Sequence, residues 1–156
     1  MLRFLLILPI LSVVAAPAFA EVSARQFVEQ EIVTRDNDGK ERIERIAADK
    51  VAPGEEVIYA LRFSNEGDAP ADAVVLVMPV PTEVSYVEGS VGGENAKITF
   101  SADGGETYVA RGRLTVSEDG EERPAKSNEI THIKWALNAP MPAKEQGEVS
   151  YHAVLK

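Results

Sequence analysis

The stretch Val57-Ile58-Tyr59-Ala60-Leu61-Arg62-Phe63 decides the fold class. Its large residues Tyr59, Leu61 and Phe63 occupy every second position. Successive side chains of a β-strand point to opposite faces of the sheet, so these three residues are expected to face a core. The residues between them are expected to face away from it. The pattern predicts a strand with one buried face.

Two further segments repeat this alternation. Residues 132–137 place Trp135 between two apolar residues at alternate positions, and residues 149–155 do the same around Tyr151. Trp135, the single tryptophan, is the expected anchor of the core. The predicted core residues are Tyr59, Leu61, Phe63, Trp135 and Tyr151.

The other predicted strands are shorter or less regular. Residues 73–77 are apolar at every position, which favours a central strand buried on both faces. Two candidate strands, 27–35 and 41–47, flank the turn Asp36-Asn37-Asp38-Gly39. They suggest an N-terminal hairpin over residues 26–47 after a short leader. The spacing of Ile43 and Ile46 also fits a helix, which leaves the second segment open. Shorter candidate strands are 84–87, 97–100, 108–110 and 113–116.

Turn signals separate these strands. Asp38-Gly39, Asp103-Gly104 and Asp119-Gly120 each suit a tight hairpin turn, because glycine accepts a positive φ at no steric cost. Residues 117–129 form the most loop-like piece. Short strands interrupted by turns predict an all-β fold, either a two-sheet antiparallel sandwich or a barrel.

The amino-terminal residues indicate export. Arg3 precedes an apolar run over residues 4–14, and residues 15–20 end in the small-x-small pattern that signal peptidase cleaves. We therefore expect residues 1–20 to be a cleaved signal peptide, with an uncleaved anchor as the alternative, and residues 21–156 to be one domain. The chain has no cysteine, which excludes disulfides, thiolate metal sites and a lipid-anchored cysteine.

The charge balance argues against two classes of partner. The formal net charge is −9, and loss of Arg3 with the signal would make the chain more negative still. Nucleic acid and anionic membrane surfaces repel a protein of this charge. We expect an unidentified protein partner in the bacterial envelope or outside the cell, and no membrane span after cleavage.

Six segments carry motifs in a specific order: 51–59, 63–71, 74–81, 84–90, 101–105 and 131–135. The first four contain a Pro-Gly-acid opening, an Asn-x-Gly turn, a strand with Pro-x-Pro and a Tyr-Val-x-Gly-Ser segment. Together they resemble a family of bacterial surface modules called domain of unknown function 11, and the last two segments resemble features of an exported subgroup. Met78 departs from the family's usual acidic residue. The resemblance covers about residues 50–155 and implies an immunoglobulin-like sandwich of stalks or adhesion modules, without enzyme activity.

No catalytic constellation stands out. The only histidines, His132 and His152, lie on the predicted outward faces of strands, and no serine lies in a Gly-x-Ser-x-Gly elbow. If their strands were neighbours, the two histidines could share a metal, but a good site needs a third ligand. We expect no catalytic residue and no cofactor, and a hydrolase is the third hypothesis.

Acidic loops leave calcium open as an alternative. Asp36 and Asp38 resemble the start of a calcium loop, but Lys40 occupies the next ligand position. A denser acidic group includes Asp119, Glu121 and Glu122. The leading hypothesis is a non-catalytic β-sandwich that works by protein contact, for example by strand addition at a sheet edge. The alternative is a calcium- or small-ligand-binding adhesion-type module that uses acidic loops at 66–72, 101–106 and 117–123.

Overall fold

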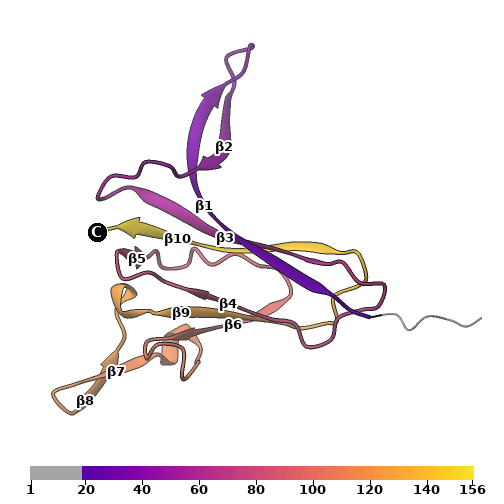
Figure 1. Cartoon of the computed structure of the whole chain (residues 1–156). Helices are drawn as coiled ribbons and strands as arrows, with labels where there is room; N and C mark the ends of the chain where they lie inside the picture. Colours follow the sequence, from indigo (N-terminus) through magenta and orange to yellow (C-terminus); the bar gives the residue numbers. More distant parts are fainter. Residues whose placement is uncertain (1–18) are drawn as a thin grey trace, which may run out of the picture.

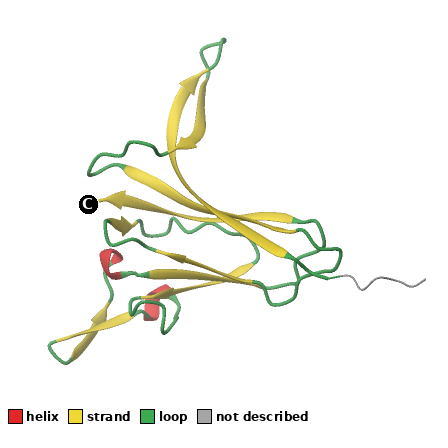
Figure 2. Cartoon of the chain, in the orientation of Figure 1, coloured by secondary structure: helices red, strands yellow, loops and turns green. Residues whose placement is uncertain are grey.

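The computed structural model describes residues 19–156, which fold almost entirely into β-strands with two short 3-10 helices (Figures 1 and 2). Most of the predicted signal peptide, residues 1–18, lies outside the described part of the chain. The elements are β1 (Val22–Arg35), β2 (Glu41–Ala47), β3 (Glu56–Asn65), β4 (Val75–Pro79), β5 (Val84–Tyr86), β6 (Ala96–Ser101), η1 (Arg111–Arg113), β7 (Thr115–Glu118), β8 (Glu121–Pro124), η2 (Ser127–Glu129), β9 (His132–Leu137) and β10 (Gln146–Leu155).

The strands form two main sheets and one separate hairpin. A five-stranded sheet has the order β2-β1-β3-β10-β5, and a three-stranded sheet has the order β4-β9-β6. In the described range, strands β7 and β8 pair only with each other. All the pairings are antiparallel. The inner faces of the two main sheets share one hydrophobic core, so the predicted all-β sandwich is confirmed.

The amino-terminal hairpin joins the larger sheet. The first half of β1 pairs with β3, from Val22 opposite Asn65 to Glu29 opposite Ile58. The second half pairs with β2, from Glu29 opposite Ala47 to Arg35 opposite Glu41. Strand β1 therefore begins earlier than the predicted residue 27, within the expected leader, and residues 41–47 are a strand rather than a helix. The hairpin of β1 and β2 projects from the sandwich (Figure 1).

Aromatic residues fill the core. Trp135 and Tyr151 are fully buried, and the Tyr151 ring stacks on Tyr59 with the centroids 5.1 Å apart. The Tyr151 hydroxyl donates a hydrogen bond to the Pro79 carbonyl across the sandwich, and burial raises its pKa. Phe63 is buried, whereas Leu61 is only partly buried. Leu61 is paired with β1, whose side chains are exposed at this level.

The prediction of a central strand at residues 73–77 is wrong. Within the described part of the chain strand β4 pairs only with β9, so it is an edge strand of the smaller sheet. Its inward residues Leu76 and Met78 are buried, but Val75 and Val77 are 54% and 43% exposed. The uniform apolar sequence concealed an ordinary alternation between a buried and an exposed face.

Two of the predicted turns, Asp38-Gly39 and Asp119-Gly120, lie at the tips of hairpins. Asp119 and Gly120 both have positive φ, 54° and 85°, as a two-residue type I′ turn requires, and they join β7 to β8. The segment predicted to be most loop-like thus contains strands. Asp103-Gly104 instead lies inside a longer loop, which the backbone pair Phe100–Val109 closes.

Candidate interaction surface

The outer face of the larger sheet carries a second buried layer. Ile58 and Ala60 of β3 are 2% and 0% exposed, although neither belongs to the core between the sheets. Their neighbours on β1 are Glu29 and Phe27, respectively. Sequence reasoning missed this layer. The available signal was the presence of apolar Ile58 and Phe27 at outward-facing positions.

Charged side chains join four strands across this face. Arg62 of β3 donates to Glu29 of β1 and to Glu148 of β10, each at 2.7 Å. Arg45 of β2 donates to the other oxygen of Glu148 at 2.9 Å and lies 3.5 Å from Glu31. The hydrogen bonds that Arg62 donates to the carboxylates of Glu148 and Glu29 raise its pKa. This network ties the projecting hairpin to the body of the sandwich.

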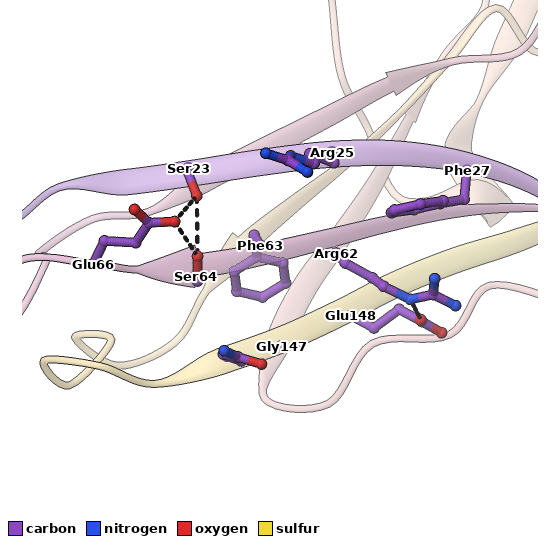
Figure 3. Close-up of a pocket in the computed structure, with 10 residues that line it drawn as sticks. Ser23, Arg25, Phe27, Arg62, Phe63, Ser64, Glu66, Gly147 and Glu148 are labelled. Carbon is purple, nitrogen blue, oxygen red and sulfur yellow. Dashed lines mark hydrogen bonds and ion pairs between the residues drawn. The ribbon is translucent and has the colours of Figure 1, made fainter.

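An open trough of about 560 Å³ lies beside this network (Figure 3). The Arg62 guanidinium lies 4.5 Å from the centre of the Phe27 ring, within the range of a cation–π contact. Phe27 remains 37% exposed. Arg25 lines the same trough and makes no ion pair with another residue of the range 19–156.

Gly147, one of the residues that line the trough, packs closely against the core residue Phe63. Gly147 of β10 pairs with Phe63 of β3. A Cβ atom on Gly147 would lie 2.5 Å from Cζ of Phe63, too close for any side chain without movement of the ring. Ser23, Ser64 and Glu66 form a polar end, in which both hydroxyls donate to Glu66 Oε1 (Figure 3). The trough thus combines an aromatic ring, a free guanidinium and hydrogen-bonding groups.

One buried asparagine holds the beginning of the described chain in place. Asn65 is fully buried at the end of β3. Its amide group donates to the carbonyl oxygens of Ala69, Met141 and Pro142, and its Oδ1 accepts from the amides of Glu21 and Gly67. Asn65 was noticed in the sequence only as part of a turn, since nothing there indicates its burial.

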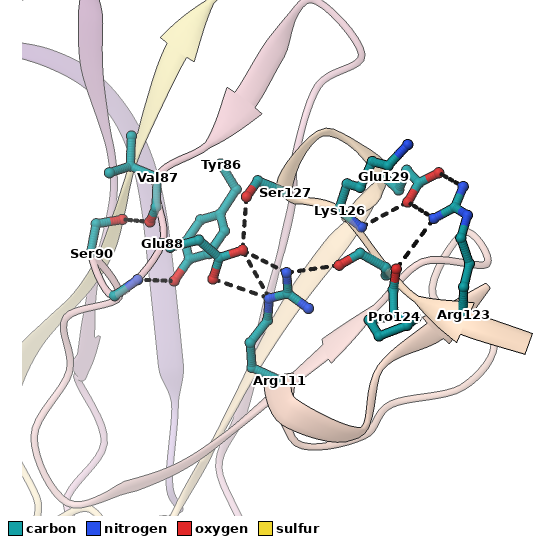
Figure 4. Close-up of polar contacts among 12 residues, drawn as sticks. Tyr86, Val87, Glu88, Ser90, Arg111, Arg123, Pro124, Lys126, Ser127 and Glu129 are labelled. Carbon is teal, nitrogen blue, oxygen red and sulfur yellow. Dashed lines mark hydrogen bonds and ion pairs between the residues drawn. The ribbon is translucent and has the colours of Figure 1, made fainter.

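The β7–β8 hairpin is fixed by two arginines (Figure 4). Arg123 donates to both oxygens of Glu129, at 2.6 and 2.8 Å, and also pairs with Glu118. The bonds from Arg123 and from the Lys126 amide lower the pKa of Glu129 to about 2. Arg111 pairs with Glu88 and donates to the Ala125 carbonyl at 2.9 Å.

The predicted acidic candidates lie on two separate hairpins. Asp36 and Asp38 belong to the β1–β2 turn, where Asp36 Oδ1 accepts from the amides of Asp38 and Lys40. Asp119, Glu121 and Glu122 lie at the β7–β8 tip. Within residues 19–156 no group of three or more histidine or acidic side chains could hold a metal ion.

The two histidines belong to different sheets. His132 is on β9 of the three-stranded sheet and His152 is on β10 of the five-stranded sheet, so their strands are not neighbours. His152 Nδ1 lies 2.6 Å from Glu56 Oε1. His132 Nδ1 is buried without a hydrogen-bond partner in the described chain. The structure therefore does not form the shared metal site considered from the sequence.

Among residues 19–156, no helix has the length and apolar character needed to cross a membrane. Comparisons with protein-family models, with curated proteins and with solved structures found no match for this chain.

Proposed function

We propose that this protein is an exported, non-catalytic β-sandwich module that binds another protein in the bacterial envelope or outside the cell. The position of the first strand supports export. Strand β1 begins at Val22, directly after the predicted cleavage site at Ala20. Cleavage there would release a chain that retains every strand of the sandwich.

The observation that carries the binding proposal is the trough on the outer face of β1, β3 and β10. It presents the partly exposed ring of Phe27, the guanidinium of Arg25 and the Ser23–Ser64–Glu66 group together. Aromatic residues and arginine are enriched in the cores of protein interfaces, because they combine a large contact area with directed hydrogen bonds. A partner with an apolar side chain for Phe27 and a carboxylate for Arg25 fits this surface.

The resemblance to domain of unknown function 11 agrees with this proposal, since that family implies secreted or surface modules without enzyme activity. No comparable observation favours the calcium-dependent alternative. Asp36 is already engaged by amides of its own turn, and the acidic β7–β8 tip lies on a hairpin that Arg123 pins through Glu118 and Glu129.

The experiment compares capture by two matched variants. Tagged protein carrying its own residues 1–20 is expressed in the native cells, the cells are fractionated, and bound proteins are quantified by mass spectrometry. Phe27→Ala is compared with Val77→Ala, which removes a similarly exposed apolar side chain from the other sheet. We expect processed protein in an exported fraction, and a captured protein that Phe27→Ala loses and Val77→Ala keeps. Retention of the tagged protein in the cytoplasm, or equal capture by both variants, would refute the proposal.

A further inference from the structure

Strand β2 presents an open sheet edge. Among the elements of residues 19–156 it pairs only with β1, and it ends the five-stranded sheet. All seven of its residues are exposed, and the hairpin that carries it projects from the sandwich (Figure 1). An open edge offers unpaired backbone groups to another strand.

The backbone pattern shows which residues of β2 point to this edge. The amide of Asp36 donates to the carbonyl of Lys40, and the amide of Ala48 donates to the carbonyl of Val28, each at 3.0 Å. Even-numbered residues of this segment therefore bond to β1. Because bonding groups alternate along a strand, Ile43 and its odd-numbered neighbours direct their N–H and C=O groups outward.

We propose that β2 pairs antiparallel with β2 of a second copy of this chain, about a two-fold axis centred on Ile43. This inference goes beyond the proposed function, because it concerns a different surface from the trough. In this register Ile43 lies opposite Ile43 of the other copy, Arg42 lies opposite Glu44, and Glu41 lies opposite Arg45. Every charged residue from Glu41 to Arg45 then faces an opposite charge, twice over by symmetry.

The neighbouring registers lack this complementarity. A two-fold axis perpendicular to the sheet places a residue opposite itself at the centre of the pair. Centring on Arg42 or Glu44 sets two like charges directly opposite each other, and so does centring on Glu41 or Arg45. Like charges directly opposite destabilise an antiparallel pair. Ile43 is the one centre between Glu41 and Arg45 that avoids this.

The free charges of β2 support the same pairing. Within residues 19–156, Arg42 and Glu44 make no ion pair, whereas Glu41 bonds Arg35 and Arg45 bonds Glu148. Charges on an edge strand usually repel a second edge, but here their order makes the edge attract its own copy.

Apolar residues add to the contact. Val33 of β1 is in register with Ile43, and the two side chains are 66% and 67% exposed. Pairing of two copies aligns Val33 and Ile43 of one chain with Ile43 and Val33 of the other across one face of a continuous sheet. This contact gives the otherwise solvent-exposed pair an apolar neighbour on the second copy.

Charge reversal tests the register. Arg42→Glu and Glu44→Arg each place two like-charged pairs in the homodimer, while a mixture of the two variants, or the double variant, restores opposite charges. Arg113→Glu and Glu122→Arg make the same changes in net charge at exposed positions away from β2. Both β2 variants alter exposed side chains, and circular dichroism checks their fold.

Sedimentation equilibrium of the processed chain gives the readout, over concentrations from about 10 µM to 1 mM because an interface this small is weak. We expect a reversible wild-type dimer, at least about tenfold weaker association of each single β2 variant, and recovery in the mixture and in the double variant. The controls should match the wild type. A monomeric wild type, a dimer that ignores both single variants, or a mixture that fails to associate would each overturn the proposal. None of these results depends on capture through the trough.

Discussion

Replacement of Trp135 by alanine tests how strongly the two sheets depend on a single side chain. Trp135 is fully buried. Gly93 packs so closely against it that a Cβ atom on Gly93 would lie 3.0 Å from Cδ1 of the indole. The indole N–H donates to the Gly92 carbonyl at 3.0 Å. That carbonyl also accepts from the Ser150 amide, so it keeps one partner in the variant.

The expected cost follows from these contacts. Truncation of a buried tryptophan costs about 3–5 kcal/mol, and the lost hydrogen bond contributes about 1 kcal/mol within that range because Gly92 stays bonded. We therefore expect Trp135→Ala to lower the free energy of unfolding by about 4 kcal/mol and the melting temperature by roughly 10–15 °C. Trp135→Phe keeps most of the apolar contact and should cost about 1–2 kcal/mol.

The assay is urea denaturation followed by far-ultraviolet circular dichroism, because the variants lose the chain's single tryptophan fluorophore. Val77→Ala, at an exposed position of β4, is the control and should change stability by less than about 0.5 kcal/mol. A Trp135→Ala variant within about 1 kcal/mol of the wild type would refute the assignment of Trp135 as the core anchor.

Three further predictions concern other parts of the fold. The folded-state pKa of Glu129 is about 2, below its usual 4.5, so its contribution to stability is present above pH 4.5 and is lost as the pH falls toward 2. Glu129→Gln should therefore flatten the dependence of the free energy of unfolding on pH in that window, as measured by urea midpoints at successive pH values. An unchanged dependence would contradict this. Gly147→Ala should cost about 1–3 kcal/mol through the clash with Phe63, whereas a thermal midpoint equal to the wild type would show that the ring yields freely. Asn65→Asp replaces three hydrogen bonds from the side-chain amide to carbonyl oxygens with repulsion between a carboxylate and those oxygens. The free energy of unfolding should fall by about 3 kcal/mol in denaturant titrations. A fall of less than about 1 kcal/mol would mean that water substitutes for the amide.

The strands that sequence predicts well are those with one face in the core. In β3, β9 and β10 the large residues occupy alternate positions, and the side chains between them are mostly polar or small. Burial of one face makes the pattern visible along the chain. Residue type also predicted the β7–β8 turn, because aspartate and glycine tolerate the positive φ that Asp119 and Gly120 adopt.

The pattern failed where apolar residues occupy both faces of a strand. Val75 and Val77 are exposed on an edge, whereas Ile58 is buried on an outer face. The difference arises from neighbouring strands, since β4 has only β9 beside it while Ile58 is flanked by Glu29 and His152. Local sequence does not encode such neighbours.

The candidate surface was beyond sequence reasoning for the same reason. Arg45, Arg62 and Glu148 come from strands far apart along the chain, and only the order β2-β1-β3-β10 brings their side chains together. The trough beside them depends on that order as well. The sequence did favour a contact function at a sheet, but it placed the alternative site in acidic loops.

The most direct test of binding through the trough is photocrosslinking from a single site. The chain has no cysteine, so Gln146→Cys and Val77→Cys each provide one attachment point for a benzophenone without a change in charge. Gln146 lines the trough and is exposed, and Val77 is exposed on β4 of the other sheet. In extracts of the native envelope we expect position 146 to give one protein adduct that unlabelled protein competes away, and position 77 to give none. Equal adducts from both positions, or no competed adduct from position 146, would contradict the account.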